Sequence, residues 1–218
     1  MRLVKMPKSK NTFAELLLGW WKKNKRDFPW RLTEDPWKIM IAEILLQKTN
    51  AEKVVEVYEK LLAVAQNPQQ ILTHSASEIA QIIKPLGLEN SKSRRIKVLS
   101  EILVKNFNGN VPVDKESLLK LPGVGAYTAA MVLCLVKGEP EPAVDVNSVR
   151  LIQRFFGYKS SRSRPRTDPN LQNFIKSLMP SKDCKKFNLA LLDFSHKICR
   201  VKPNCLNCPL NIMCSHLI

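Results

Sequence analysis

The chain has 218 residues, and 35 lysines and arginines against 19 acidic residues give a formal net charge of +16 and a pI near 9.8. This length can bury a full hydrophobic core in one domain or two small lobes, so the fold does not depend on disulfides. A secretory signal and a long apolar run are both missing from the sequence, which excludes a membrane-spanning class and predicts a soluble, intracellular protein. The positive charge predicts a polyanionic partner.

Helical periodicity and helix start signals recur along nearly the whole chain, so the predicted fold class is all-α. The capping box Thr12-Phe13-Ala14-Glu15 predicts a helix to about Lys25. Asp35-Pro36 is an N-cap followed by proline and predicts a helix to about Gln47, and Ser75-Ala76-Ser77-Glu78 is a second capping box. The polar segment 160–166 is rich in helix breakers and is expected to be a loop. Further helices are expected near 51–64, 91–106, 115–121, 126–137, 146–156, 169–178 and 183–198.

A glycine-containing turn, Leu121-Pro122-Gly123-Val124-Gly125, lies between a short amphipathic helix and an apolar one. Gly123 and Gly125 permit backbone geometry that a side chain would forbid, and the turn exposes amides at the N-terminus of the following helix. Such a turn can bind a phosphate. Taken alone, Gly-x-Gly between helices is more typical of a tight helix connection.

Four cysteines lie within the last twenty residues at the spacing C-x5-C-x2-C-x5-C. Thiolates this close in sequence can converge on one metal centre, and a reducing compartment favours metal over disulfide. Both zinc and iron–sulfur chemistry suit such ligands. The remaining pair, Cys134 and Cys184, is expected to be buried. The candidate metal ligands are Cys199, Cys205, Cys208 and Cys214.

The segment from Leu121 to Ala129 resembles the helix-hairpin-helix of the endonuclease III superfamily of DNA glycosylases, and the resemblance covers roughly residues 12 to 216. Asp145 lies 18 residues after Tyr127 and matches the family's catalytic aspartate, although aspartate is also a common N-cap. Both roles can hold at once. The cysteines resemble the family's 4Fe-4S loop, whose usual first gap is six residues rather than five. The resemblance implies a structural 4Fe-4S cluster, with zinc as the minor alternative, and a loop that presents Arg200 and Lys202 to DNA.

Two carboxylates form the implied catalytic set, because breaking a glycosidic bond leaves an oxocarbenium-like sugar and a departing base that needs a proton. Asp145 would stabilise the sugar cation and orient water. Glu43 matches the glutamate of the adenine and thymine mismatch glycosylases, and its apolar neighbours disfavour exposure. Tyr127 stands where strand-cleaving members carry a lysine, and tyrosine cannot form a Schiff base. The resemblance therefore implies a monofunctional DNA glycosylase without strong lyase activity.

Contacts with a flipped-out nucleotide are also implied by position. Gln47 and Lys48 match the family's wedge residues, and Leu88 stands where adenine glycosylases carry a tyrosine. The segments 86–92 and 26–31 look more like archaeal thymine mismatch glycosylases. Adenine glycosylases usually carry an additional C-terminal domain, whereas this chain ends four residues after Cys214.

The expected function is therefore removal of thymine or uracil opposite guanine from duplex DNA in base excision repair. The alternatives are removal of adenine opposite guanine or 8-oxoguanine, and a catalytically silent mismatch-binding protein. The expected architecture is a six-helix lobe, 35–144, and a second lobe formed by 1–34 with 145–218. A cleft between the lobes would receive Glu43 and Asp145. We expect a monomer in the cytoplasm or nucleoid of a prokaryotic-type cell.

Overall fold

The computed structural model describes residues 9–217, and all regular secondary structure in this range is helical. The expected all-α class is therefore confirmed for the described residues. Contacts divide the chain into two compact units. The inner unit is Asp27–Lys137, and the terminal unit joins the residues up to Arg26 with those from Gly138 onward. Within 9–217, no helix is both long and apolar enough to cross a bilayer.

The unit boundaries lie at Asp27 and Gly138 rather than at residues 35 and 145, and aromatic and polar contacts explain the difference. Trp30 stacks on Phe28 with ring centroids 4.9 Å apart and meets the edge of Tyr58 at 5.4 Å. The connection before residue 35 therefore packs into the inner unit. At the other boundary, Asn188 accepts a hydrogen bond from the backbone amide of Ala143 at 3.0 Å, which fixes the segment after Gly138 to the terminal unit.

The inner unit is described throughout and contains seven α-helices rather than the six expected. The unpredicted helix, α4, is only six residues long, too short for a periodic pattern. Its start signal is nevertheless present, because Asn67 caps the amide of Gln70 and Pro68 follows the cap. The α-helices are α2 (Pro36–Leu46), α3 (Ala51–Val64), α4 (Pro68–Thr73), α5 (Ala76–Ile83), α6 (Glu89–Phe107), α7 (Lys115–Lys120) and α8 (Ala126–Lys137), with 3-10 turns at Pro29–Arg31 and Lys84–Leu86.

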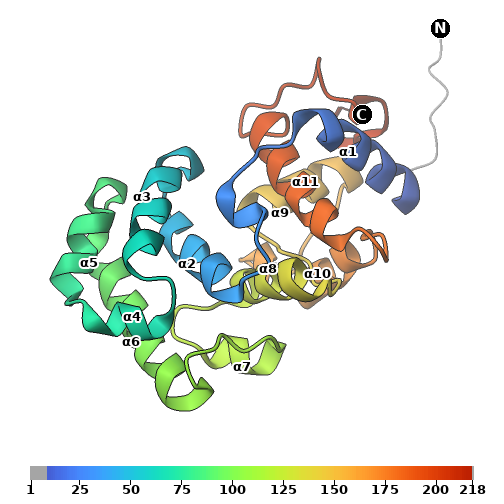
Figure 1. Cartoon of the computed structure of the whole chain (residues 1–218). Coiled ribbons are helices and arrows are strands. Elements are labelled where there is room, and N and C mark those ends of the chain that lie inside the picture. The colour runs from blue at the N-terminus through green and yellow to red at the C-terminus, as the bar shows by residue number, and fades with distance from the viewer. Residues whose placement is uncertain (1–8, 218) are drawn as a thin grey trace, which may run out of the picture. The chain divides into compact units, whose positions relative to one another are not determined.

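Helix α2 is the centre of the inner unit and packs against α3, α6 and α8 (Figure 1). The predicted N-cap is confirmed, since the Asp35 carboxylate accepts hydrogen bonds from the amides of Trp37 and Lys38. Eight of the eleven α2 residues are buried, so the helix is surrounded on all sides rather than on one face. Any polar side chain in the middle of α2 is therefore carried into the core.

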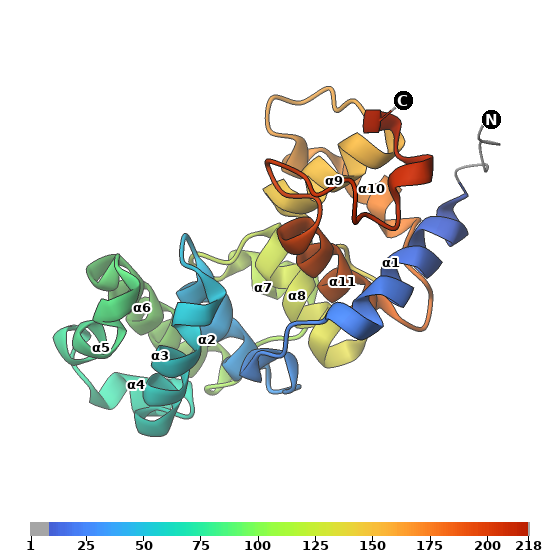
Figure 2. The same cartoon turned by 90° about the horizontal axis from the view of Figure 1, so that it is seen from above.

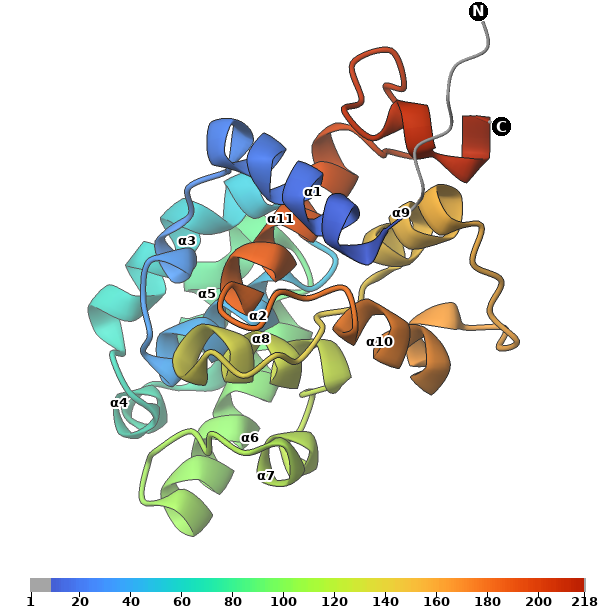
Figure 3. The ribbon, with the colours of Figure 1, turned by 90° about the vertical axis from the view of Figure 1, so that its right-hand side faces the viewer.

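The terminal unit holds the first helix and the last three α-helices of the chain. Helix α1 begins at Lys10 rather than at Thr12, because the Ser9 hydroxyl accepts a hydrogen bond from the Thr12 amide at 2.9 Å and caps the helix one turn earlier. The loop expected at 160–166 is confirmed except for a 3-10 turn near its end (Figure 3). The elements are α1 (Lys10–Asn24), α9 (Val146–Phe156), α10 (Pro169–Lys176) and α11 (Cys184–Lys197), with 3-10 turns at Pro165–Thr167, Asn211–Met213 and Ser215–Leu217.

Helix α11 packs against both α1 and α9 (Figure 2). The ring of Phe13 on α1 lies 4.9 Å from that of Phe155 on α9 and 6.4 Å from that of Phe187 on α11. The buried carboxylate of Asp193 on α11 accepts hydrogen bonds from Trp21 at 2.9 Å and from the Arg26 guanidinium at 2.7 Å. This aromatic core and the ion pair hold the end of α1 and the start of the four-cysteine segment, residues 199–214, in one unit.

Candidate functional site

Glu43 is a buried acid in the middle of α2, with 5% of its surface exposed. Burial raises the pKa of its carboxyl from the ordinary 4.5 to about 8, although the positive charge of Arg31 opposes this shift. The carboxyl is therefore mostly protonated at neutral pH. A neutral carboxylic acid held in an apolar environment can donate a proton, which is the property that a general acid requires.

The hairpin between α7 and α8 has one glycine that its geometry requires and one that it does not. Gly123 has a left-handed φ of 78°, and a Cβ there would lie 2.4 Å from the Cδ atom of Arg95. Gly125 does not have a positive φ, and a Cβ added there would meet nothing within 4 Å. The expectation that both glycines are sterically required is therefore correct for Gly123 and wrong for Gly125. Val124 is buried, with 7% of the residue exposed, so its side chain can offer a ligand little contact.

The turn after α2 carries Gln47 and Lys48. Lys48 is exposed and has a left-handed φ of 56°, which is strained for a residue with a side chain. The side-chain carbonyl of Gln47 accepts a hydrogen bond from Arg95, and its amide reaches the carbonyl of Gly123 at 3.5 Å. This turn and the hairpin are therefore joined within the inner unit. Leu88, at the start of α6, is 53% exposed and also left-handed, with φ of 58°.

Tyr127 occupies the second position of α8 and is partly exposed. It follows the hairpin directly, where the first amides of α8 have no carbonyl partner within the helix. Its side chain ends in a phenol, which is not an amine nucleophile. Those amides and the adjoining glycines give this end of α8 the character of an anion site.

Asp145 is the N-cap of α9, as the sequence predicts. One carboxylate oxygen accepts hydrogen bonds from the amides of Asn147 and Ser148, at 3.0 and 2.7 Å, and the other accepts from the Asn147 side chain at 2.7 Å. The Ser148 hydroxyl accepts from the Asp145 amide and completes a capping box. These donors fix the direction of the carboxylate.

Asn147 connects Asp145 to the four-cysteine segment. The Asn147 carbonyl oxygen accepts a hydrogen bond from Arg150 at 2.9 Å. Arg150 also donates to the carbonyls of Cys199 at 2.9 Å and Ser195 at 3.1 Å. The guanidinium therefore joins the start of α9, the end of α11 and the first cysteine. The contacts of Arg150 with Cys199 and Ser195 could not be predicted from the sequence, because they join distant segments.

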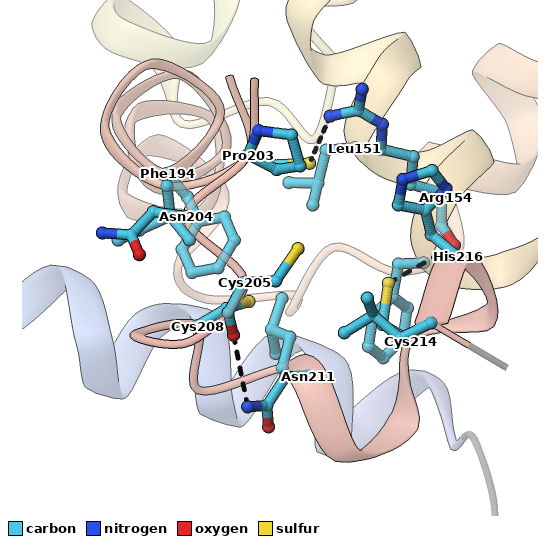
Figure 4. A pocket seen from close by; sticks show the side chains of 15 residues that line it. Leu151, Arg154, Phe194, Pro203, Asn204, Cys205, Cys208, Asn211, Cys214 and His216 are labelled. Carbon is cyan, nitrogen blue, oxygen red and sulfur yellow. Dashed lines mark hydrogen bonds between the residues drawn. The ribbon is translucent and has the colours of Figure 1, made fainter. Parts of the chain in front are cut away.

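The four cysteines line one pocket of the terminal unit, with about 350 Å3 of empty space, part of it open to solvent (Figure 4). Burial raises the pKa of the Cys208 thiol to about 11, and the three neighbouring cysteines add to this shift. Arg154 donates toward the Cys199 sulfur at 3.8 Å. Among residues 9–217, no three His, Cys, Asp or Glu side chains are grouped closely enough to hold a metal ion. The pocket is lined by Cys199, Cys205, Cys208 and Cys214 and by apolar residues that include Leu151, Phe155, Phe194 and Leu210.

Two basic side chains of the cysteine segment, Arg200 and Lys202, are exposed. Arg154 on α9 fixes the backbone around them, because its guanidinium donates hydrogen bonds to the carbonyls of Arg200 at 2.6 Å and Val201 at 3.1 Å. The charges therefore project from a fixed segment rather than from a free loop. Such cations can contact a phosphate backbone. The expected burial of Cys134 and Cys184 is confirmed.

Residues 41–177 match the profile of the HhH-GPD superfamily base excision DNA repair proteins. The chain belongs to this superfamily. It is 43% identical over 202 residues to a thymine/uracil-DNA glycosylase of Pyrobaculum aerophilum, covering 91% of this chain and 88% of the relative. It is 39% identical to a thymine/uracil-DNA glycosylase of Methanothermobacter thermautotrophicus, covering 96% and 95%. A solved thermostable thymine-DNA glycosylase matches this HhH-GPD chain with a TM-score of 0.90, at 39% identity over 95% of this chain and 96% of the other.

Proposed function

We propose that this protein is a monofunctional DNA glycosylase that hydrolyses the glycosidic bond of thymine or uracil opposite guanine in duplex DNA. The observation that carries the proposal is the burial of Glu43, which keeps a carboxylic acid protonated at neutral pH. Two relatives of this protein, the thymine/uracil-DNA glycosylases of Pyrobaculum aerophilum and Methanothermobacter thermautotrophicus, support the choice of base. The net charge of +16 supports a duplex DNA partner, which we propose is bound by a single copy of the chain.

In the proposed reaction, the bond between the sugar and the base breaks and its electron pair leaves with the base. Glu43 donates a proton to the departing base. The carboxylate of Asp145, held by the start of α9, stabilises the cation that develops on the sugar. Water then adds to the sugar and gives its proton to Asp145. The products are a free base and an abasic site with an intact backbone.

Tyr127 supports hydrolysis without strand cleavage. Cleavage by elimination requires an amine that forms a Schiff base with the sugar, and a phenol cannot supply one. The amides at the start of α8, together with Gly123, Val124 and Gly125, are proposed to bind a phosphate. Lys48 and Leu88 are proposed to enter the duplex where the nucleotide has left, with Gln47 beside them. Arg200 and Lys202 are proposed to contact the backbone.

The four cysteines are proposed to hold a 4Fe-4S cluster, whose role when bound is to stabilise the segment between α11 and the C-terminal turns. Thiolates are the ligands that both a 4Fe-4S cluster and a zinc ion take. That all four cysteines line one pocket supports a shared site for such a group, with zinc as the alternative to the cluster.

The base preference is tested with four duplexes that carry T:G, U:G, A:G and A:8-oxoguanine pairs. We expect excision from T:G and U:G, with strand breaks only after alkali, because Tyr127 cannot cleave the backbone. The measurement is single-turnover release of base and strand breakage, with and without alkali. Excision confined to the adenine duplexes would replace the proposed substrate, breaks without alkali would remove the monofunctional assignment, and binding without any release would favour the silent mismatch-binding alternative.

The cofactor is tested on protein purified without oxygen. We expect a brown preparation with about four irons per chain, and we expect iron loss to lower the thermal stability of the terminal unit. Iron and zinc contents by elemental analysis are the measurement, together with the visible spectrum. A colourless preparation with one zinc per chain would contradict the cluster. Cys184→Ser is the control, because this buried cysteine does not line the pocket, and we expect its iron content to equal that of the wild type.

A further inference from the structure

Two exposed turns of the inner unit are strained in the same way. Lys48, after α2, and Leu88, before α6, have left-handed φ values of 56° and 58°. Only Asn108 shares this feature among the non-glycine residues that the structure describes, and asparagine tolerates it at a helix end. Backbone strain of this kind persists only where surrounding contacts hold it. The contacts that hold these turns lead to one buried side chain.

That side chain is Lys92 on α6, which is 2% exposed. Its ammonium donates hydrogen bonds to the carbonyl of Leu45 at 2.8 Å and to the hydroxyl of Thr49 at 2.6 Å. The Thr49 hydroxyl lies in turn 3.2 Å from the carbonyl of Gln47 and 3.5 Å from the carbonyl of Leu86. A single chain of contacts therefore runs from the end of α2, across Thr49, to the residue just before Gly87 and Leu88.

The end of α2 depends on this ammonium. The last carbonyls of a helix have no intrahelical partner. The carbonyl of Ile44 accepts from the Gln47 amide at 3.3 Å, and the carbonyl of Leu46 accepts from the Thr49 amide at 3.1 Å. The Leu45 carbonyl between them accepts from Lys92. A cation is also favoured at a helix C-terminus by the helix dipole.

Burying a lysine opposes folding, and this lysine has an unfavourable setting. Desolvation lowers the pKa of Lys92, and the neighbouring charge of Arg95 lowers it further. An apolar side chain of similar length would fill the same space without this electrostatic cost. The ammonium lies between two strained turns. This position supports a role in holding the turns in place rather than in stabilising the fold.

We propose that Lys92 is a positioning residue that holds the Lys48 turn and the Leu88 turn in a fixed relation, so that both side chains can enter the duplex together. This inference rests on the proposed function. Lys92 acts through Thr49 and the end of α2 and touches no substrate. Removing the ammonium or the Thr49 hydroxyl leaves the chemistry of Glu43 intact but frees the turns from each other.

The test uses full-length Lys92→Met and Thr49→Val, with Lys97→Met as the matched control. Lys97 lies on the same helix, and its ammonium also donates to backbone carbonyls, those of Ile71, Leu72 and His74. Nucleotide flipping is followed by the fluorescence of 2-aminopurine placed beside the target base. Excision is followed under single turnover, and affinity is measured on a duplex with an abasic-site analogue, which has no base to flip.

We expect both variants to lower the excision rate by about tenfold or more and to reduce the fluorescence rise, with affinity for the abasic duplex nearly unchanged. The double variant should lose no more than the larger single loss, because the two residues share one contact. Lys97→Met should keep the wild-type rate. If Lys92→Met does not fold, Thr49→Val alone decides. Wild-type rates and fluorescence in the folded variants would overturn the inference, whereas a wild type that releases no base overturns the proposed function itself.

Discussion

Replacing Asp145 by asparagine is expected to lower single-turnover base release by about a thousandfold, with little change in fold or in affinity for duplex DNA. Asparagine is as good an N-cap as aspartate, and its side-chain oxygen can accept the same hydrogen bonds from the amides of Asn147 and Ser148. The substitution therefore removes the negative charge while keeping the helix start. Loss of activity without loss of structure would place the charge, rather than the cap, in the reaction.

Asp168→Asn is the matched control for this prediction. Asp168 is also an N-cap of the terminal unit, and its carboxylate accepts hydrogen bonds from the Asn170 amide at 2.9 Å and from Ser160 at 2.7 Å. The same chemical change at the start of α10 should leave the excision rate within about twofold of the wild type, because asparagine keeps the N-cap and Asp168 has no role in the proposed reaction. Equal losses at Asp145 and Asp168 would mean that the effect is structural. Turnover that survives in Asp145→Asn would remove the proposed role of the charge.

Helix starts were predictable because each is encoded within a few consecutive residues. The caps at Asp35, Ser75 and Asp145 are all present as predicted. The start of α1 was misplaced because two hydroxyls, those of Ser9 and Thr12, stand one turn apart and local pattern does not choose between them. Burial of Glu43 followed from the apolar residues on both sides of it, 39–42 and 44–46.

Contacts between distant segments were not predictable. The hydrogen bond from Lys92 to Leu45 joins positions 47 residues apart, and that from Arg150 to Cys199 joins positions 49 residues apart. Lys92 and Arg150 lie in segments that resemble the family, but their residue type does not indicate which carbonyls they contact. Gly125 shows the opposite error, since a motif suggested a steric need that its backbone does not have. Chemistry that depends on tertiary packing is therefore visible only in the folded chain.

Replacing Glu43 by glutamine is expected to lower excision by about a hundredfold or more, because an amide has the shape of the acid but no proton to transfer. In the wild type, excision should fall as the pH rises through about 8, where the Glu43 carboxyl ionises. The fall should disappear in Glu43→Gln. The measurement is the single-turnover rate at a saturating protein concentration between about pH 6 and 9.5, a range that brackets this pKa.

The same substitution should stabilise the protein at neutral and alkaline pH. The pKa of Glu43 is raised on folding from 4.5 to about 8, so between these values the folded chain binds a proton that the unfolded chain has lost. As the pH rises through this range, the free energy of unfolding of the wild type therefore declines, by at most about 1.4 kcal/mol per pH unit. This decline is the penalty for burying Glu43. Below pH 4.5 the carboxyl is neutral in both states and the penalty is absent. At pH 7 this penalty is on the order of 3 kcal/mol.

Glutamine at position 43 cannot ionise, so the stability difference between the variant and the wild type should be small near pH 4.5 and widen steadily toward pH 8. Denaturant unfolding at several pH values measures this difference. Glu101→Gln, at an exposed position on α6, is the control and should show no such widening. A stability difference that widens with pH for Glu43→Gln but not for Glu101→Gln would identify Glu43 as a buried acid that opposes folding. The loss of activity and the gain of stability in Glu43→Gln would then have the same cause, the removal of one buried carboxyl. A difference that stays constant across this pH range would show that Glu43 is ionised in the folded chain, and it could not then act as the proton donor.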